Sequence, residues 1–104
     1  MTASVVVQPE AEADLVAAFA WYERRRTGLG HEFLIEIDRI IARIAEKPML
    51  AAPVYRDVRR TKPGRFPYVV FYVPREDHIH ILGVLHQRRD PKLGVTRADD
   101  FDSE

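Results

Sequence analysis

Residues 65–86, RFPYVVFYVPREDHIHILGVLH, decide the fold of this chain. Two apolar runs, 65–73 and 78–86, flank the polar tetrapeptide PRED. Runs of this length, rich in Val, Ile, Tyr and Phe and separated by a short polar turn, predict two antiparallel strands. Because both runs are apolar at nearly every position, we expect two central strands that are largely covered on both faces.

Two further extended segments complete the predicted sheet. Residues 54–60, VYRDVRR, precede the turn TKPG and carry enough charge for an edge strand, where charge discourages sheet-to-sheet aggregation. Residues 4–8, SVVVQ, are short and β-branched and end at Pro9, which predicts a first strand near the N-terminus.

Two amphipathic helices are predicted between the first strand and the rest of the sheet. Residues 10–26 begin with acids and end with RRR, the charge order that suits a helix dipole, and the break TGLG separates them from a second apolar repeat that ends at Lys47 and Pro48. The apolar positions with helical spacing are Leu15, Ala18, Phe19 and Tyr22 in the first helix and Phe33, Ile37, Ile40, Ile41 and Ile44 in the second. We therefore predict an α+β domain of order β-α-α-β-β-β, with a helical hairpin packed on one face of a small, mostly antiparallel sheet.

The composition is that of one globular domain, with 104 residues of which 46% are apolar and 31% charged. The chain has no cysteine, which excludes disulfides, thiolate metal sites and cysteine nucleophiles and favours a reducing cytoplasm. We find neither the apolar run of roughly 18 residues that spans a bilayer nor a basic leader, so we expect no export and no membrane insertion. His78 and His80 have the spacing of a metal pair, but no further ligand pattern completes a site, so we predict no metal and no cofactor.

Charge is distributed unevenly along a chain that is neutral overall. Residues 56–65 hold four arginines and a lysine against one acid, whereas residues 97–104, RADDFDSE, have a net charge of −3, which leaves +3 for the rest. We expect residues 1–96 to form the domain. We expect residues 97–104 to be a flexible acidic tail that either shields the basic surface or is disordered.

The last strand is expected to present its polar residues at its end. If residues 78–89 form one strand, alternate side chains share a face, so His86 and Arg88 should emerge together. The expected faces are Ile79, Ile81, Gly83 and Leu85 on one side and His78, His80, Leu82, Val84, His86 and Arg88 on the other. His86 is a candidate general acid or base near neutral pH, with a purely structural role as the alternative.

Antiparallel pairing should bring basic residues from three strands to the same end of the sheet, since Arg65 begins the strand beside the last one. The expected members are Arg59, Arg60, Lys62, Arg65, Arg88 and Arg89. Such a cluster predicts a phosphate or carboxylate site, because guanidinium groups offer paired donors to oxyanions. The alternative is a solvated rim neutralised by Asp57, Asp90 or the acidic tail.

Three aromatic or apolar residues have open interpretations. Tyr72 shares a strand face with Tyr68, and it would stack on a base, donate a proton or simply fill the sheet surface. Trp21 and Ile35 lie off the apolar stripes of their helices and are candidates for a partner surface.

Three stretches together resemble the RelE/ParE superfamily of bacterial toxins from type II toxin–antitoxin modules. They are EAEADLVAAFAWYERRRTGLGHEFL (residues 10–34), RFPYVVFYV (65–73) and VLHQRRDP (84–91), in this order and spacing. The chain resembles the ParE-like, plasmid stabilisation branch more closely than the ribosome-dependent nucleases. The resemblance implies a small α+β toxin held inactive by a cognate antitoxin whose C-terminal segment wraps its surface.

The resemblance also implies two alternative targets. ParE-like members are associated with poisoning of DNA gyrase, and RelE-like members cut messenger RNA on the ribosome with basic residues and often a tyrosine or histidine near the last strand. The positions here that could correspond are Arg59, Arg60, Lys62, Arg65, His86, Arg88 and Arg89. Gln87 stands where some nucleases have an aromatic acid–base residue, which favours the ParE-like interpretation.

Three hypotheses follow. The first is a protein inhibitor without chemistry of its own, acting on gyrase through target or phosphate contacts from Arg59, Arg60, Lys62, Arg65, Tyr72, Arg88 and Arg89. The second is a messenger RNA endonuclease on the ribosome with His86, Arg65 and Arg88 as catalytic residues. The third is an inactive relative that only binds antitoxin. All three predict a hetero-oligomer with an antitoxin that lies along a sheet edge or in an apolar groove.

Overall fold

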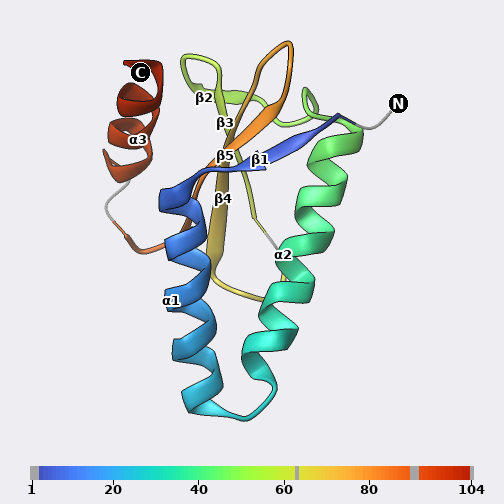
Figure 1. The fold of residues 1–104 in the computed structure, drawn as a ribbon, viewed down its shortest axis with the longest axis vertical. Helices are drawn as coiled ribbons and strands as arrows, with labels where there is room; N and C mark the ends of the chain where they lie inside the picture. Colours follow the sequence, from blue (N-terminus) through green and yellow to red (C-terminus); the bar gives the residue numbers. More distant parts are fainter. Residues whose placement is uncertain (1–2, 63, 90–91, 104) are drawn as a thin grey trace.

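A computed structural model describes residues 3–62, 64–89 and 92–103 of the chain (Figure 1). Its elements are β1 (Val5–Val7), α1 (Pro9–Arg25), α2 (Leu29–Glu46), β2 (Pro53–Tyr55), β3 (Val58–Thr61), β4 (Tyr68–Pro74), β5 (Ile79–His86) and α3 (Lys92–Asp102). The strands form one sheet in the order β1-β5-β4-β3-β2. Only β1 and β5 pair in parallel, and the other neighbours are antiparallel. The predicted α+β class with a mostly antiparallel sheet is confirmed.

The segment predicted as one strand over residues 54–60 is two short strands instead. Arg56 has a φ of 53°, and Tyr55 pairs with Val58, so the chain reverses at Arg56 and Asp57. This tight turn makes β2 the outer edge of the sheet, and Pro53 at its start lacks an N–H that another strand could use.

The helical hairpin of α1 and α2 covers one face of the sheet, as predicted. Phe33 and Ile37 of α2 pack with Val70 of β4 and Ile81 of β5 in the main core. At the hairpin turn the Glu23 carboxylate accepts hydrogen bonds from the amides of Gly28 and Gly30, at 3.1 and 2.8 Å. Glu23 thereby caps α2, and these backbone hydrogen bonds lower its pKa.

The opposite face of β4 and β5 is covered by α3. Residues 97–102 belong to this helix, so the structure differs from the expected flexible tail. Ala98 is 1% exposed and packs in a second cluster with Val58, Val73 and Leu82. The sequence signal for α3 is weak because its mean hydropathy is low. It consists only of the i, i+4, i+7 spacing of Gly94, Ala98 and Phe101.

A β-bulge in β5 changes which side chains face the helical hairpin. Phe71 pairs with Gly83 but Tyr72 pairs with Ile81, so Leu82 is an extra residue in β5. As a result Ile81 and Val84 lie in the same core, and Leu82 lies in the cluster under α3. The strict alternation expected from the sequence, which placed Ile81 and Val84 on opposite faces, is wrong.

Candidate functional site

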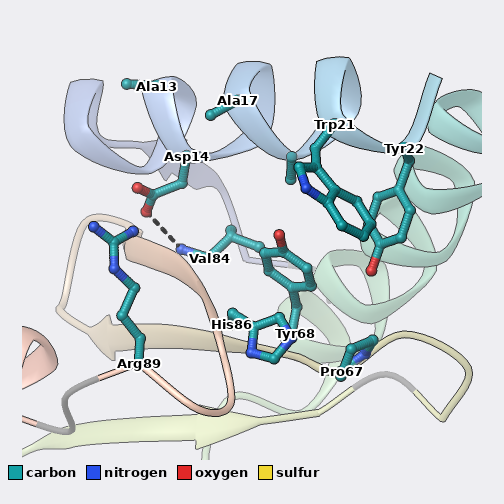
Figure 2. A pocket seen from close by; sticks show the side chains of 11 residues that line it. Ala13, Asp14, Ala17, Trp21, Tyr22, Pro67, Tyr68, Val84, His86 and Arg89 are labelled. Atoms are coloured by element: carbon teal, nitrogen blue, oxygen red, sulfur yellow. Dashed lines mark hydrogen bonds between the residues drawn. The ribbon is translucent and has the colours of Figure 1, made fainter. Parts of the chain in front are cut away.

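An apolar groove lies between α1 and the adjoining ends of β4 and β5 (Figure 2). It has a volume of about 690 Å³. Its lining is Ala13, Asp14, Ala17, Ala18, Trp21, Tyr22, Pro67, Tyr68, Val84, His86 and Arg89. Small alanines on α1 leave the space open, and Trp21, which is 43% exposed, forms part of its wall. The groove thus combines an apolar floor with charged groups, Asp14 and Arg89, at one end (Figure 2).

Aromatic packing fixes the floor of this groove. The Tyr68 ring contacts Tyr22 and Phe33 in the core and meets the His86 ring edge to face, at a centroid distance of 5.3 Å. Burial raises the pKa of Tyr68, while the nearby Arg89 charge opposes that shift. The phenol therefore stays protonated at neutral pH.

His86 is held in one orientation by the turn that follows β5. Its Nδ1 accepts a hydrogen bond from the backbone amide of Arg88 at 3.1 Å, so Nδ1 carries no proton and the neutral ring is protonated on Nε2. His86 faces the groove, whereas Arg88 lies on the far side of the turn, so the two do not emerge together as expected.

A second surface, the basic hollow, lies on the sheet face opposite the groove. We define it by Arg60, Lys62 and Arg88, which line a depression of about 580 Å³ together with Thr61, Val69 and Gln87. The Lys62 Nζ lies 3.5 Å from Oε1 of Gln87, which connects the end of β3 to the turn after β5. An adjoining depression of about 260 Å³ shares Arg60 and reaches Arg89 and His86.

Three of the predicted binding residues lie elsewhere. Arg65 forms an ion pair with Glu32 of α2, at 2.7 Å, and lies over the Phe66 ring. This hydrogen bond lowers the pKa of Glu32. Arg59 and Tyr72 are 6% and 1% exposed, so neither offers a surface contact.

The buried pair Arg59 and Tyr72 anchors the chain between α2 and β2. Arg59 donates to the carbonyl of Ala51 at 2.6 Å, and the Tyr72 hydroxyl donates to the carbonyl of Pro48 at 2.9 Å. The two residues are cross-strand partners in β3 and β4. The sequence pattern of basic and aromatic residues did not distinguish these structural roles from binding roles.

Sequence reasoning missed Asp14 and Arg97, which join two helices at the rim of the groove. Arg97 of α3 donates to both carboxylate oxygens of Asp14 in α1 and to the Leu82 carbonyl at 3.2 Å. Asp14 also accepts the Val84 amide at 2.9 Å (Figure 2). Asp14 was assigned only to a helix dipole and Arg97 to a flexible tail, so no signal linked them.

Within the described ranges, no cluster of three or more His, Asp or Glu residues could hold a metal ion. His80 Nδ1 instead accepts a hydrogen bond from Nε2 of Gln8 at 3.0 Å, and the His80 ring packs on Phe101 of α3. No helix in the part of the chain that the structure describes is long and apolar enough to cross a membrane. Asp90, a candidate for neutralising the cluster, falls outside the described residues.

The sequence profile of the ParE toxin of type II toxin–antitoxin systems, parDE, matches residues 5–91. The chain belongs to the ParE toxin family. "Toxin ParE2" of Mycobacterium tuberculosis, in strains CDC 1551 and H37Rv, is 28% identical over 92 residues, which is 88% of each chain. A solved structure titled "Chromosomal ParDE TA system from P. aeruginosa" has the same fold, with a TM-score of 0.73 and 17% identity over 82% of this chain and 96% of that one.

The ParE family match covers both surfaces described above but ends before α3. The groove and the basic hollow are therefore built from the part of the chain that the family profile describes. The helix that joins α1 through Arg97 and Asp14 lies outside the matched residues.

Proposed function

We propose that this ParE toxin inhibits bacterial growth by poisoning DNA gyrase in the cytoplasm through protein–protein contact, and that a cognate antitoxin neutralises it in a hetero-oligomer. In this mechanism the toxin makes and breaks no covalent bond. Family membership supports the toxin class, and the arrangement of the residues around His86 supports inhibition without chemistry.

The observation that carries the proposal is the separation of the three residues that a nuclease would need. His86 faces the groove with Nδ1 occupied, Arg65 is paired with Glu32, and Arg88 lines the basic hollow on the other face of the sheet. A general base and a phosphate-stabilising arginine must lie within about 3 Å of the reacting atoms. The separation of these three residues supports inhibition without chemistry over a nuclease that uses them.

The test combines purified gyrase with the purified toxin. We expect the toxin to inhibit supercoiling of relaxed plasmid and to trap a cleaved DNA complex, and we expect rapid loss of DNA synthesis with filamentation in cells. His86→Ala should keep both effects, because its ring has no part in a chemical step. Unaffected supercoiling at excess toxin would overturn the proposal.

The groove is the surface we assign to the antitoxin. Its apolar floor suits the apolar side chains of a helix or extended segment, and the charged Arg89 beside it suits an acidic residue of the same segment. Trp21 is the single tryptophan of the chain, so its fluorescence reports on this wall alone. Titration with an antitoxin peptide that itself lacks tryptophan should shift the emission to shorter wavelength, and unchanged emission at saturation would place the antitoxin elsewhere.

A ribosome-dependent endonuclease is the second candidate, favoured by the depression that connects His86 with Arg60 and Arg89. It predicts an immediate loss of protein synthesis after induction, with cleavage of messenger RNA. It also predicts that His86→Ala loses most toxicity while antitoxin binding survives. Tight antitoxin binding without any growth effect would instead indicate an inactive relative.

A further inference from the structure

Among the residues that the structure describes, the three cations of the basic hollow have no carboxylate partner, unlike two arginines at the other end of the sheet. Arg56 and Arg75 pair with acids of α3 or of the β2–β3 turn. By contrast, no ion pair of Arg60, Lys62 or Arg88 occurs within residues 3–62, 64–89 and 92–103. Their positive charge is therefore available to an external anion.

The acidic residues of α3 leave this charge in place because they lie at the other end of the sheet. Asp102 binds Arg75 at 2.8 Å beside the β4–β5 turn, and Asp99 accepts the Tyr55 hydroxyl at 2.8 Å beside the β2–β3 turn. The basic hollow lies where β3 and β5 end and β4 begins. Although the chain is neutral overall, it therefore carries a local positive potential at this end of the sheet.

The backbone that carries these cations is held by hydrogen bonds rather than left as an open loop. In the turn after β5, Gln87 donates to the Pro67 carbonyl at 2.8 Å and the Arg89 amide donates to the His86 carbonyl at 2.9 Å. On the other side, Thr61 pairs with Val70 in the β3–β4 ladder. Arg60, Lys62 and Arg88 are exposed at fixed backbone positions around the buried Val69.

We propose that the basic hollow binds the phosphate backbone of duplex DNA, namely the DNA segment that the target topoisomerase holds. The inference rests on the proposed function. Two guanidinium groups and an ammonium group around one shallow depression suit phosphodiesters, which accept several charge-assisted hydrogen bonds without sequence readout. The toxin thus contacts its target through protein and the DNA gate through Arg60, Lys62 and Arg88, which favours the ternary complex over either binary one.

The test compares two charge-matched triple variants. Arg60→Gln, Lys62→Gln and Arg88→Gln together remove the basic hollow, whereas Arg24→Gln, Arg43→Gln and Lys47→Gln remove the same charge from exposed positions on the helical hairpin. Circular dichroism and urea unfolding establish that both fold. Affinity is then measured for gyrase alone, for gyrase with a bound duplex and for a labelled duplex alone, across a KCl series.

We expect the wild type to bind the gyrase–duplex complex more tightly than gyrase alone. Three phosphate contacts give a log–log salt slope of about −2.7, so this advantage should fall about 40-fold between 50 and 200 mM salt. The hollow variant should lose the advantage while binding gyrase alone as the wild type does. The hairpin control should keep it.

One result would overturn the inference without ambiguity about the proposed function: a hollow variant that keeps the full duplex advantage. If that variant loses affinity for the antitoxin instead, acidic side chains are the occupant of the basic hollow. If the wild type does not bind gyrase, the proposed function fails. The measurement with duplex alone still tests whether the basic hollow binds phosphate. Equal binding of duplex by the wild type and the hollow variant at low salt then rejects the phosphate site.

Discussion

Asp14 in α1 and Arg97 in α3 form a bidentate ion pair that passes over Gly83 of β5. A Cβ at Gly83 would lie 2.8 Å from the Arg97 guanidinium, so glycine leaves the space through which the arginine reaches the carboxylate. The side chains are only 10% and 17% exposed, and the hydrogen bonds from Arg97 to Asp14 raise the pKa of Arg97. One charge pair therefore ties together the helices on opposite faces of the sheet.

Removal of one member of this pair should destabilise the fold. We expect Arg97→Met, which keeps an apolar stem, to lower the free energy of unfolding by about 2–4 kcal/mol because it leaves the partly buried Asp14 without its cation. Urea unfolding of Arg97→Met, Asp14→Asn and the double variant gives the coupling energy. A coupling below that of the exposed pair Arg39 and Glu36, measured in the same way, would contradict a stabilising role.

A chain that ends at Thr96 tests the role of the last residues. A flexible tail could be removed without cost, whereas loss of Ala98, Phe101 and the Arg97 pair should lower the free energy of unfolding by about 3–5 kcal/mol, which is more than Arg97→Met alone should cost. The exposed cluster of Val58, Val73 and Leu82 should also bind an apolar dye such as ANS. A matched chain that ends at Asp102 should behave as the full-length protein does.

Glu23 should make stability depend on pH in the acid range. Its folded pKa lies below the ordinary value of 4.5, so its contribution is fully present above that value and is lost as pH falls through the folded pKa. We expect Glu23→Gln to remove this part of the acid dependence because glutamine does not titrate in this range, while its amide oxygen still accepts the Gly28 amide. Thermal midpoints measured from about pH 3 to about pH 7 check this expectation. Parallel profiles for the variant and the wild type would refute it.

Trp21 should contribute much of the antitoxin affinity. An exposed tryptophan in the wall of an apolar groove has the features of a binding hot spot, so Trp21→Ala should weaken antitoxin binding by about 30-fold, or about 2 kcal/mol. The control is Ile35→Ala, which removes a side chain of α2 that is 51% exposed but does not line the groove. Calorimetric titration should separate the two variants, and equal losses would argue against the groove.

Tyr72 should affect stability and not toxicity. Tyr72→Phe removes only the hydrogen bond to the Pro48 carbonyl, which should cost about 1 kcal/mol in unfolding. Growth arrest by the variant should match that of the wild type at equal soluble concentration. A stable variant without toxicity would return Tyr72 to the set of functional residues.

The sequence predicted the elements whose signals are local. Regular spacing of Phe33, Ile37 and Ile44 identified α2, and the apolar run after Pro67 identified β4. It also predicted covered faces for the central strands, and α3 provides the second cover. Sequence-based prediction failed where the role of a residue depends on contacts between distant segments. Neither the burial of Arg59 nor the contact of Arg97 with Asp14 produces a periodic pattern in the sequence.

The bulge at Leu82 determines what the two surfaces at the end of β5 are made of. Beyond it, Val84 and His86 face the groove while Leu85 faces the other side. Without the inserted residue, continued alternation from Ile81 would turn His86 away from the groove. A relative that gains or loses one residue here would therefore exchange the chemistry of its two faces without a single substitution. Residue-by-residue alignment across this strand would then match side chains that point in opposite directions.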